Sequence, residues 1–130
     1  MTGKKEDLIN YRISRAIETI KEAEAMIEKE FWNASINRMY YACYYIVSGL
    51  MLKHGFDSST HKGLRTLLGK HFVLTGLISK EMAKTFSDLY DRRQTGDYDD
   101  FILYDRETAE NLLPLCKEFV TEIEKLVRTN

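Results

Sequence analysis

The stretch Asn33–Leu52, NASINRMYYACYYIVSGLML, decides the fold of this chain. Its apolar and aromatic side chains recur at helical spacing, yet they occupy all sides of the helix rather than one stripe. A helix with this distribution usually lies at the centre of a protein and is buried on most sides. Gly55, a typical helix stop, follows shortly after, so we predict a central helix from about Trp32 to His54.

The remainder of the chain also has a helical period, and the alternation typical of strands is almost absent. The other predicted helices span about Glu6–Glu30, His61–Phe72, Lys80–Thr95 and Arg106–Arg128. Pro114, the only proline, should kink the last helix or disturb it locally. We therefore predict one all-α domain over residues 1–130, an up-and-down antiparallel bundle of about five helices.

The composition limits the classes of function that fit. With 19 basic and 20 acidic residues, the net charge of −1 argues against a surface built throughout for nucleic acid, although a local basic site stays open. Cys43 and Cys116 fall within apolar helical patterns and are typical of core thiols in a reducing compartment. The three histidines have no partners at ligand spacing, so we expect no metal site and no cofactor.

The start of the chain is polar and basic and leads directly into a predicted helix, which is not the pattern of a signal peptide. No apolar run approaches the roughly 18 residues that a membrane-spanning helix needs. We expect a cytoplasmic protein without a membrane span.

The first stretch that could carry chemistry lies in the central helix. Asn37, Tyr41 and Tyr45 are four residues apart, and Arg38 is three residues before Tyr41, so these side chains can touch. A polar seam in a buried helix is costly unless a partner or ligand pairs with it. The alternative is an aromatic core with one edge of hydroxyl groups.

The second stretch is Thr60-His61-Lys62-Gly63, at the start of the third predicted helix. Exposed amides and two basic side chains at a helix start favour an anion. The alternative is a capped surface helix in which His61 only packs.

The third stretch runs from Asp91 to Asp99. The adjacent arginines Arg92 and Arg93 lie near a helix end, and Arg93 can pair with Asp97 across one turn. An arginine fork is the usual reader of a phosphate group. The alternative is an intramolecular cluster of salt bridges that closes the helix.

Taken together, these stretches resemble a small prokaryotic HEPN domain over nearly the whole chain. The blocks that carry the resemblance, in order, are Asn37–Tyr45, His54-Gly55, His61–Leu64, Gly69–Val73, Thr75–Leu77 and Leu89–Phe101. The resemblance implies a helical protein, a homodimer formed through its inner helices, and a minimal nucleotidyltransferase as partner. Some members of the family are metal-independent ribonucleases and toxins, and others bind nucleotides or act as non-catalytic partners.

The ribonuclease members resemble one another in an arginine followed, four to six residues later, by a histidine. The arginine holds the scissile phosphate, and the histidine moves a proton of the ribose hydroxyl near neutral pH. Here Arg93 is followed at that distance by Tyr98, and Arg92 by Asp97. A tyrosine, with an ordinary pKa of about 10, is a poor base at neutral pH. The resemblance therefore implies Arg93 as a phosphate contact, and leaves Arg93, Tyr98 and His61 as the candidates for catalysis.

We expect a non-catalytic or weakly active HEPN domain that dimerises and offers a polar cleft to a nucleotide, an RNA or a nucleotidyltransferase. One alternative is a metal-independent endoribonuclease toxin that uses Arg93 with His61 or Tyr98. Another is a purely structural helical subunit whose polar seam fixes the register of a dimer. The predicted ligand-binding residues are Asn37, Arg38, Tyr41, His61, Lys62, Arg92, Arg93, Asp97 and Tyr98.

Overall fold

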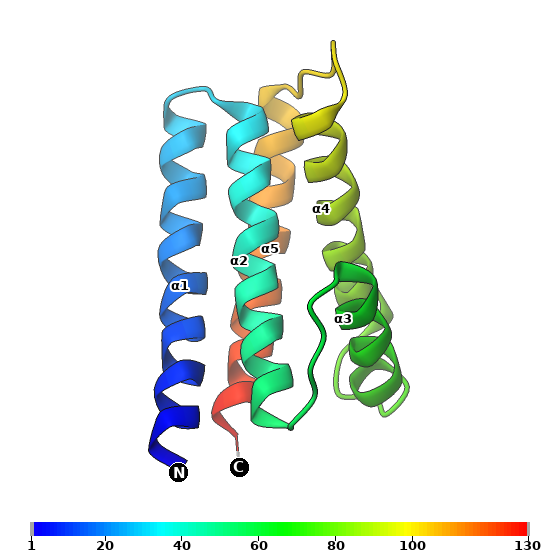
Figure 1. Cartoon of the computed structure of the whole chain (residues 1–130). Helices are drawn as coiled ribbons and strands as arrows, with labels where there is room; N and C mark the ends of the chain where they lie inside the picture. Colours follow the sequence, from blue (N-terminus) through cyan, green and yellow to red (C-terminus); the bar gives the residue numbers. More distant parts are fainter. Residues whose placement is uncertain (1, 130) are drawn as a thin grey trace.

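The computed structural model describes residues 2–129, which fold into helices joined by short loops, with no strand in that range (Figure 1). The elements are α1 (Thr2–Glu28), α2 (Trp32–Lys53), α3 (His61–Leu68), the short π-helix η1 (Gly69–Val73), α4 (Lys80–Tyr98) and α5 (Arg106–Arg128). The prediction of an all-α antiparallel bundle is confirmed. Within the described range, no helix is long and apolar enough to cross a membrane.

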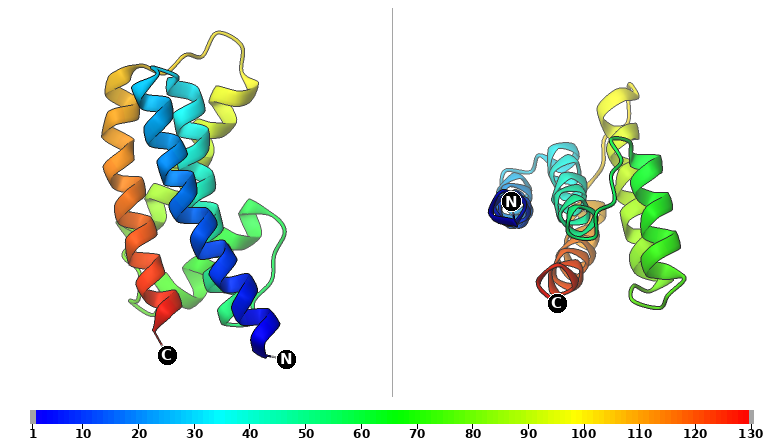
Figure 2. Two further views of the ribbon diagram at one scale, coloured as in Figure 1. Left: turned by 90° about the vertical axis from the view of Figure 1, so that its left-hand side faces the viewer. Right: turned by 60° about the horizontal axis from the view of Figure 1, so that its bottom comes forward.

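Helix α2 lies at the centre of the molecule and packs against α1, α3, α4 and α5 (Figure 2). Its fully buried side chains include Ile36, Met39, Cys43, Ile46, Val47 and Leu50. This arrangement explains why apolar residues occur around most of α2, since other helices cover it except along the partly buried edge that carries Tyr41, Tyr44 and Tyr45.

The outer helix α5 has one apolar stripe, because it faces the bundle on one side only. The buried members of the stripe are Ala109, Leu112, Cys116, Phe119, Val120, Ile123 and Val127. Pro114 lies on the exposed side, and the helix continues through it from Arg106 to Arg128. The proline therefore removes one backbone hydrogen bond without ending the helix.

The predicted boundaries of three helices differ from those in the structure. Helix α4 continues to Tyr98 instead of ending at Thr95, because Gly96 serves close packing rather than a helix stop. A Cβ at Gly96 would lie 3.0 Å from the ring of Tyr104 and 3.4 Å from Nδ2 of Asn33. The third helix ends as an α-helix at Leu68, and η1 takes over the rest of its predicted length.

The first helix also differs at both ends from its predicted span: α1 begins at Thr2 and ends at Glu28. Glu30 then has a φ of 63°, in the left-handed region that terminates helices. Side-chain caps fix the starts of three other helices. Thr60, Ser79 and Asp105 accept from the backbone N–H groups of Gly63, Met82 and Thr108, at 3.0, 3.1 and 2.9 Å.

Candidate functional site

Helices α2 and α4 bring together polar residues that are far apart in the sequence. Nη1 of Arg93 lies 3.5 Å from Oδ2 of Asp97, so the predicted pair across one turn of α4 is present. Nδ2 of Asn37 donates to the same carboxylate oxygen at 2.8 Å. The extension of α4 to Tyr98 makes this possible, because it places Asp97 one helical turn after Arg93.

Arg38 extends this network toward α1. Its Nε and Nη2 donate to Oδ1 of Asn37 at 3.0 and 2.7 Å, and its Nη1 lies 3.3 Å from a carboxylate oxygen of Glu22. Asn37 therefore links the two arginines, since it donates to the partner of Arg93 and accepts from Arg38. Sequence reasoning missed Glu22, whose position on a charged face of α1 gives no local signal of this contact.

Aromatic rings surround the guanidinium of Arg93, whose side chain is only 11% exposed. Four ring centroids lie 5.1 to 6.0 Å from its Cζ, and they belong to Tyr40, Tyr41, Tyr90 and Tyr98. The hydroxyl of Tyr41 also lies 3.4 Å from Nη1 of Arg93. The negative faces of such rings stabilise a desolvated cation, so the cage offsets part of the cost of burying this charge.

His61 lies against the same cage from the start of α3. Its ring stacks on Tyr90 with centroids 3.8 Å apart, and its Nδ1 is 3.2 Å from the hydroxyl of Tyr40. Burial lowers the pKa of His61 to about 4, with a further lowering by Arg65. The imidazole is therefore neutral at pH 7 and packs within the cluster rather than offering a positive charge at the helix start.

Two buried polar atoms of this region have no hydrogen-bond partner: Nε of Arg93 and Nε2 of His61. Among the side chains of the described residues, these are the buried nitrogen and oxygen atoms left unsatisfied. An unsatisfied buried donor or acceptor costs roughly 1–3 kcal/mol and calls for an explanation, such as a ligand or a catalytic role. That both lie in one cluster marks it as the candidate site.

Two predicted site residues lie apart from the cluster. Arg92 faces the ring of Tyr104 at 5.9 Å, and its carbonyl accepts from the hydroxyl of Tyr104 at 3.0 Å. Lys62 is exposed and borders a separate shallow pocket at the start of α3. Tyr98 belongs to the cluster, although its side chain is largely exposed.

Tyr40 and Tyr90 are site residues that sequence reasoning did not select. Tyr40 lies in the stretch Asn37–Tyr45 of α2, where its surroundings indicate a residue of the aromatic core, and it is buried. Tyr90 precedes Arg93 by three residues, a spacing that places both on one helical face. This spacing could have identified Tyr90 as a site residue from the sequence. Tyr40 could be identified only from the packing of α4 against α2.

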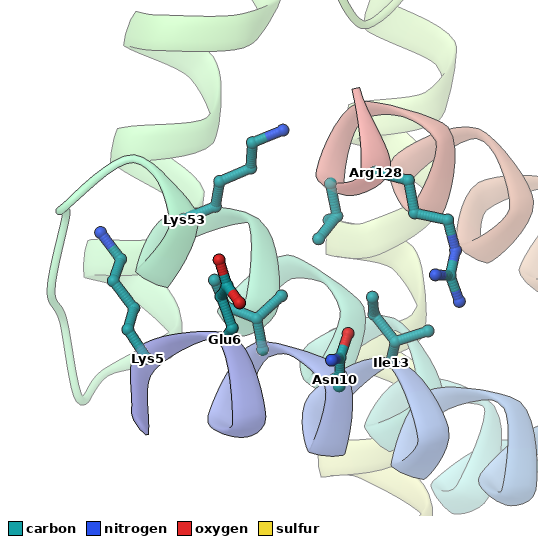
Figure 3. A pocket seen from close by; sticks show the side chains of 8 residues that line it. Lys5, Glu6, Asn10, Ile13, Lys53 and Arg128 are labelled. Atoms are coloured by element: carbon teal, nitrogen blue, oxygen red, sulfur yellow. The ribbon is translucent and has the colours of Figure 1, made fainter. Parts of the chain in front are cut away.

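A cavity of about 540 Å³ lies at the opposite end of the bundle and contains none of the predicted site residues (Figure 3). Its lining residues are Lys5, Glu6, Ile9, Asn10, Ile13, Lys53, Val127 and Arg128. Lys53 donates to the carbonyl of Leu126 at 3.2 Å, and Arg128 pairs with Glu124 at 2.7 Å. These cations are thus engaged at the end of α5. Within the described part of the chain, no three His, Cys, Asp or Glu side chains are placed to hold a metal ion.

A solved structure with a similar fold is that of the protein TT1696 from Thermus thermophilus. The TM-score is 0.77, and the match covers 91% of this chain and 97% of that one. Because the sequences are only 16% identical, the likeness shows a shared fold.

Sequence relatives match most of the chain. A "UPF0332 protein" of Thermotoga maritima is 33% identical over 125 residues, which cover 96% of this chain and 95% of the relative. A Methanocaldococcus jannaschii protein named "Putative toxin MJ0142" is 29% identical over 113 residues, which cover 87% of this chain and 77% of the relative. The sequence profile of the HEPN domain matches residues 9–126, and the chain therefore belongs to the HEPN domain family.

Proposed function

We propose that the α2–α4 cluster binds the phosphate of a nucleotide or an RNA, as part of a non-catalytic or weakly active HEPN domain. The observation that carries this proposal is the pair of guanidiniums from Arg38 and Arg93, which lie 5.1 and 5.4 Å from the centroid of the same Tyr41 ring. Two arginine forks from two helices offer a phosphate several donors at once.

The internal contacts of both arginines support this reading. Charge-assisted hydrogen bonds to a carboxylate are usually about 2.7–2.9 Å long, whereas the Arg93–Asp97 and Arg38–Glu22 contacts are 3.5 and 3.3 Å. The Nε of Arg93 has no partner at all. A phosphate would supply acceptors to Nε of Arg93 and to the Nη1 groups that face the carboxylates, whereas the other guanidinium donors already bond to Asn37 and Gln94. The exposed ring of Tyr98 lies beside Arg93, where it can stack on a base.

The test is calorimetric titration of the protein with ATP and with a short unstructured RNA. Arg93→Ala should weaken binding at least tenfold. Arg92→Ala is the matched control, because Arg92 is the neighbouring arginine and faces Tyr104 instead of the cluster. Equal losses in the two variants would indicate a general charge effect. A wild-type protein that binds neither ligand would contradict the proposal and favour a purely structural helical subunit.

A second candidate function is a metal-independent endoribonuclease toxin. A relative carries a toxin name, and His61 shares the tyrosine cage with Arg93. The lowered pKa of His61 keeps its imidazole unprotonated at neutral pH but also makes it a weak base. Incubation of purified protein with RNA in a metal chelator decides this point. Cleavage that disappears in both His61→Ala and Arg93→Ala would establish it, and intact RNA with wild type would contradict it.

We further propose that the domain forms a homodimer along the edge of α2, and that a minimal nucleotidyltransferase is its partner. Tyr41, Tyr44 and Tyr45 support the first proposal, because they are only partly buried while most of α2 is covered. The second proposal follows from the resemblance to HEPN domains. Co-expression with a nucleotidyltransferase encoded by an adjacent gene, followed by co-purification through a tag on one partner, tests it. Separate elution would contradict it.

A further inference from the structure

The loop between α4 and α5 holds large apolar side chains in solvent. Phe101 is 100% exposed and Leu103 is 87% exposed. The loop meets the turn between α1 and α2 at the same end of the bundle (Figure 2). There a cavity of about 480 Å³ is lined by residues of both segments, including Phe31, Trp32, Leu103 and Tyr104. We call Phe31, Trp32, Phe101 and Leu103, with this cavity, the apolar tip.

Hydrogen bonds and the backbone conformation of the loop keep the apolar tip exposed. Nδ2 of Asn33 donates to the carbonyls of Gly96 and Ile102 at 3.2 and 2.9 Å, and its Oδ1 accepts from the backbone N–H of Tyr104 at 2.8 Å. Phe101 has a φ of 70°, a left-handed conformation that is unfavourable for a phenylalanine. The hydrogen bonds of Asn33 thus hold the loop in a shape that keeps Phe101 away from the core.

The charges around the apolar tip select the kind of partner. Residues 28–34 and 99–107, which lie outside the α2–α4 cluster, together contain six acidic and two basic residues. One of the basic residues, Arg106, already pairs with Glu30 at 2.7 Å and lies over the ring of Trp32. Nucleic acids and anionic membranes would be repelled here. A second copy that docked through its own tip would bring the same negative charge against this surface.

We propose that the apolar tip docks a segment of another protein that carries apolar anchors flanked by lysine or arginine. The anchors would enter the cavity beside Trp32 and pack on Phe101 and Leu103, because exposed apolar surface gains most by being covered. The flanking cations would face Asp99 and Asp100, which precede Phe101. This docking does not depend on a ligand in the α2–α4 cluster.

Trp32 makes the proposal directly measurable, because it is the only tryptophan and lines the cavity. The probe is a synthetic 18-residue amphipathic peptide of leucine and lysine, and its matched peptide replaces every lysine with glutamate. The leucine–lysine peptide should shift the emission of Trp32 at saturating concentrations, and the leucine–glutamate peptide should not. The double variant Asp99→Asn with Asp100→Asn should weaken binding and reduce its dependence on salt.

The apolar contribution is tested with matched pairs of substitutions. Phe101→Ser with Leu103→Ser should raise the Kd of the leucine–lysine peptide at least tenfold. Leu74→Ser with Leu77→Ser should leave the Kd unchanged, because these leucines are exposed on the turn before α4, outside the apolar tip. Circular dichroism confirms that each variant is folded.

Three results would overturn the proposal. The first is an equal loss in both serine pairs, which would indicate nonspecific apolar binding. The second is equal binding of both peptides, which would remove the role of charge. The third is a wild-type dimer that Phe101→Ser with Leu103→Ser converts to a monomer in sedimentation experiments, because the occupant would then be a second copy of the chain.

Discussion

Arg93 combines a low exposure with an incomplete set of partners. A guanidinium with 11% exposure loses most of its hydration. In its place it has one carboxylate at 3.5 Å, the amide oxygen of Gln94 at 2.9 Å, the hydroxyl of Tyr41 at 3.4 Å and four aromatic rings. Arg93 therefore contributes little net stability, because the loss of hydration offsets much of what its contacts contribute. Its substitution therefore separates a binding role from a structural role.

We predict that Arg93→Ala weakens binding of a nucleotide or a short RNA at least tenfold, whereas Tyr98→Phe has a smaller effect. The guanidinium can donate charge-assisted hydrogen bonds that contribute roughly 1.5–3 kcal/mol, and the hydroxyl of Tyr98 can contribute one neutral bond of roughly 0.5–1.5 kcal/mol. Fluorescence titration of both variants, beside a melting curve for each, measures the two effects. Lower stability with unchanged binding in Arg93→Ala would show that its pair with Asp97 is its main role.

We predict that His61 makes the protein less stable as the pH falls from about 6.5 to about 4. Its pKa is about 4 in the folded protein and about 6.5 in the unfolded chain, so the unfolded chain binds the proton more readily. The stability is therefore complete above pH 6.5 and is lost below it. Urea unfolding at pH 7 and pH 4.5 should show a smaller difference for His61→Phe than for wild type. His54, whose pKa burial also lowers, remains in both proteins as a common background.

At the scale of the elements, Asn33 connects the start of α2 to the end of α4 and to the following loop. We predict that Asn33→Ala loosens this loop, with a loss of roughly 0.5–1.5 kcal/mol for each hydrogen bond removed. Hydrogen exchange at the backbone N–H of Tyr104 should become faster, and the melting temperature should fall. Asn111→Ala on the exposed face of α5 is the control. Unchanged exchange at Tyr104 would mean that the loop holds its shape without Asn33.

The type and order of the elements were predictable from the sequence, because apolar periodicity reports which side of a helix is buried. The spans of α2 and α5 agree with prediction for this reason. Gly96 misled the prediction of the end of α4, because a glycine is used both to stop a helix and to admit a close neighbour. Only the position of Tyr104 against Gly96 distinguishes the two uses.

The candidate site was predictable in part, because the sequence reports contacts within one helix but not contacts between helices. Helical spacing predicted that Asn37, Arg38 and Tyr41 share a face, and that Arg93 can meet Asp97. The contact of Asn37 with Asp97 joins residues 60 positions apart, which no local pattern reports. Helical spacing to Asp97 and the family resemblance both favoured Arg93 over Arg92, but the sequence did not show that Arg92 turns away from the cluster toward Tyr104.

At the scale of the whole molecule, we predict a homodimer with twice the chain mass of 15.2 kDa. The partly buried Tyr41, Tyr44 and Tyr45 on α2 would be covered by a second copy, because aromatic side chains are favoured at such contacts. Light scattering at micromolar concentration measures the mass, and a monomer would contradict the prediction. Tyr44→Glu should shift the protein toward monomer, whereas Phe101→Ser should leave the dimer intact.

The central place of α2 also bears on how the protein is made. Helix α5 covers one side of α2, where Sγ of Cys116 lies 3.8 Å from Sγ of Cys43 and 3.4 Å from the carbonyl of Met39. Helix α5 follows α1 to α4 in the chain. It therefore leaves the ribosome after α2, whose surface it covers in the folded protein. During that interval the nascent chain exposes this surface to chaperones and proteases, and the core closes only when α5 has been translated.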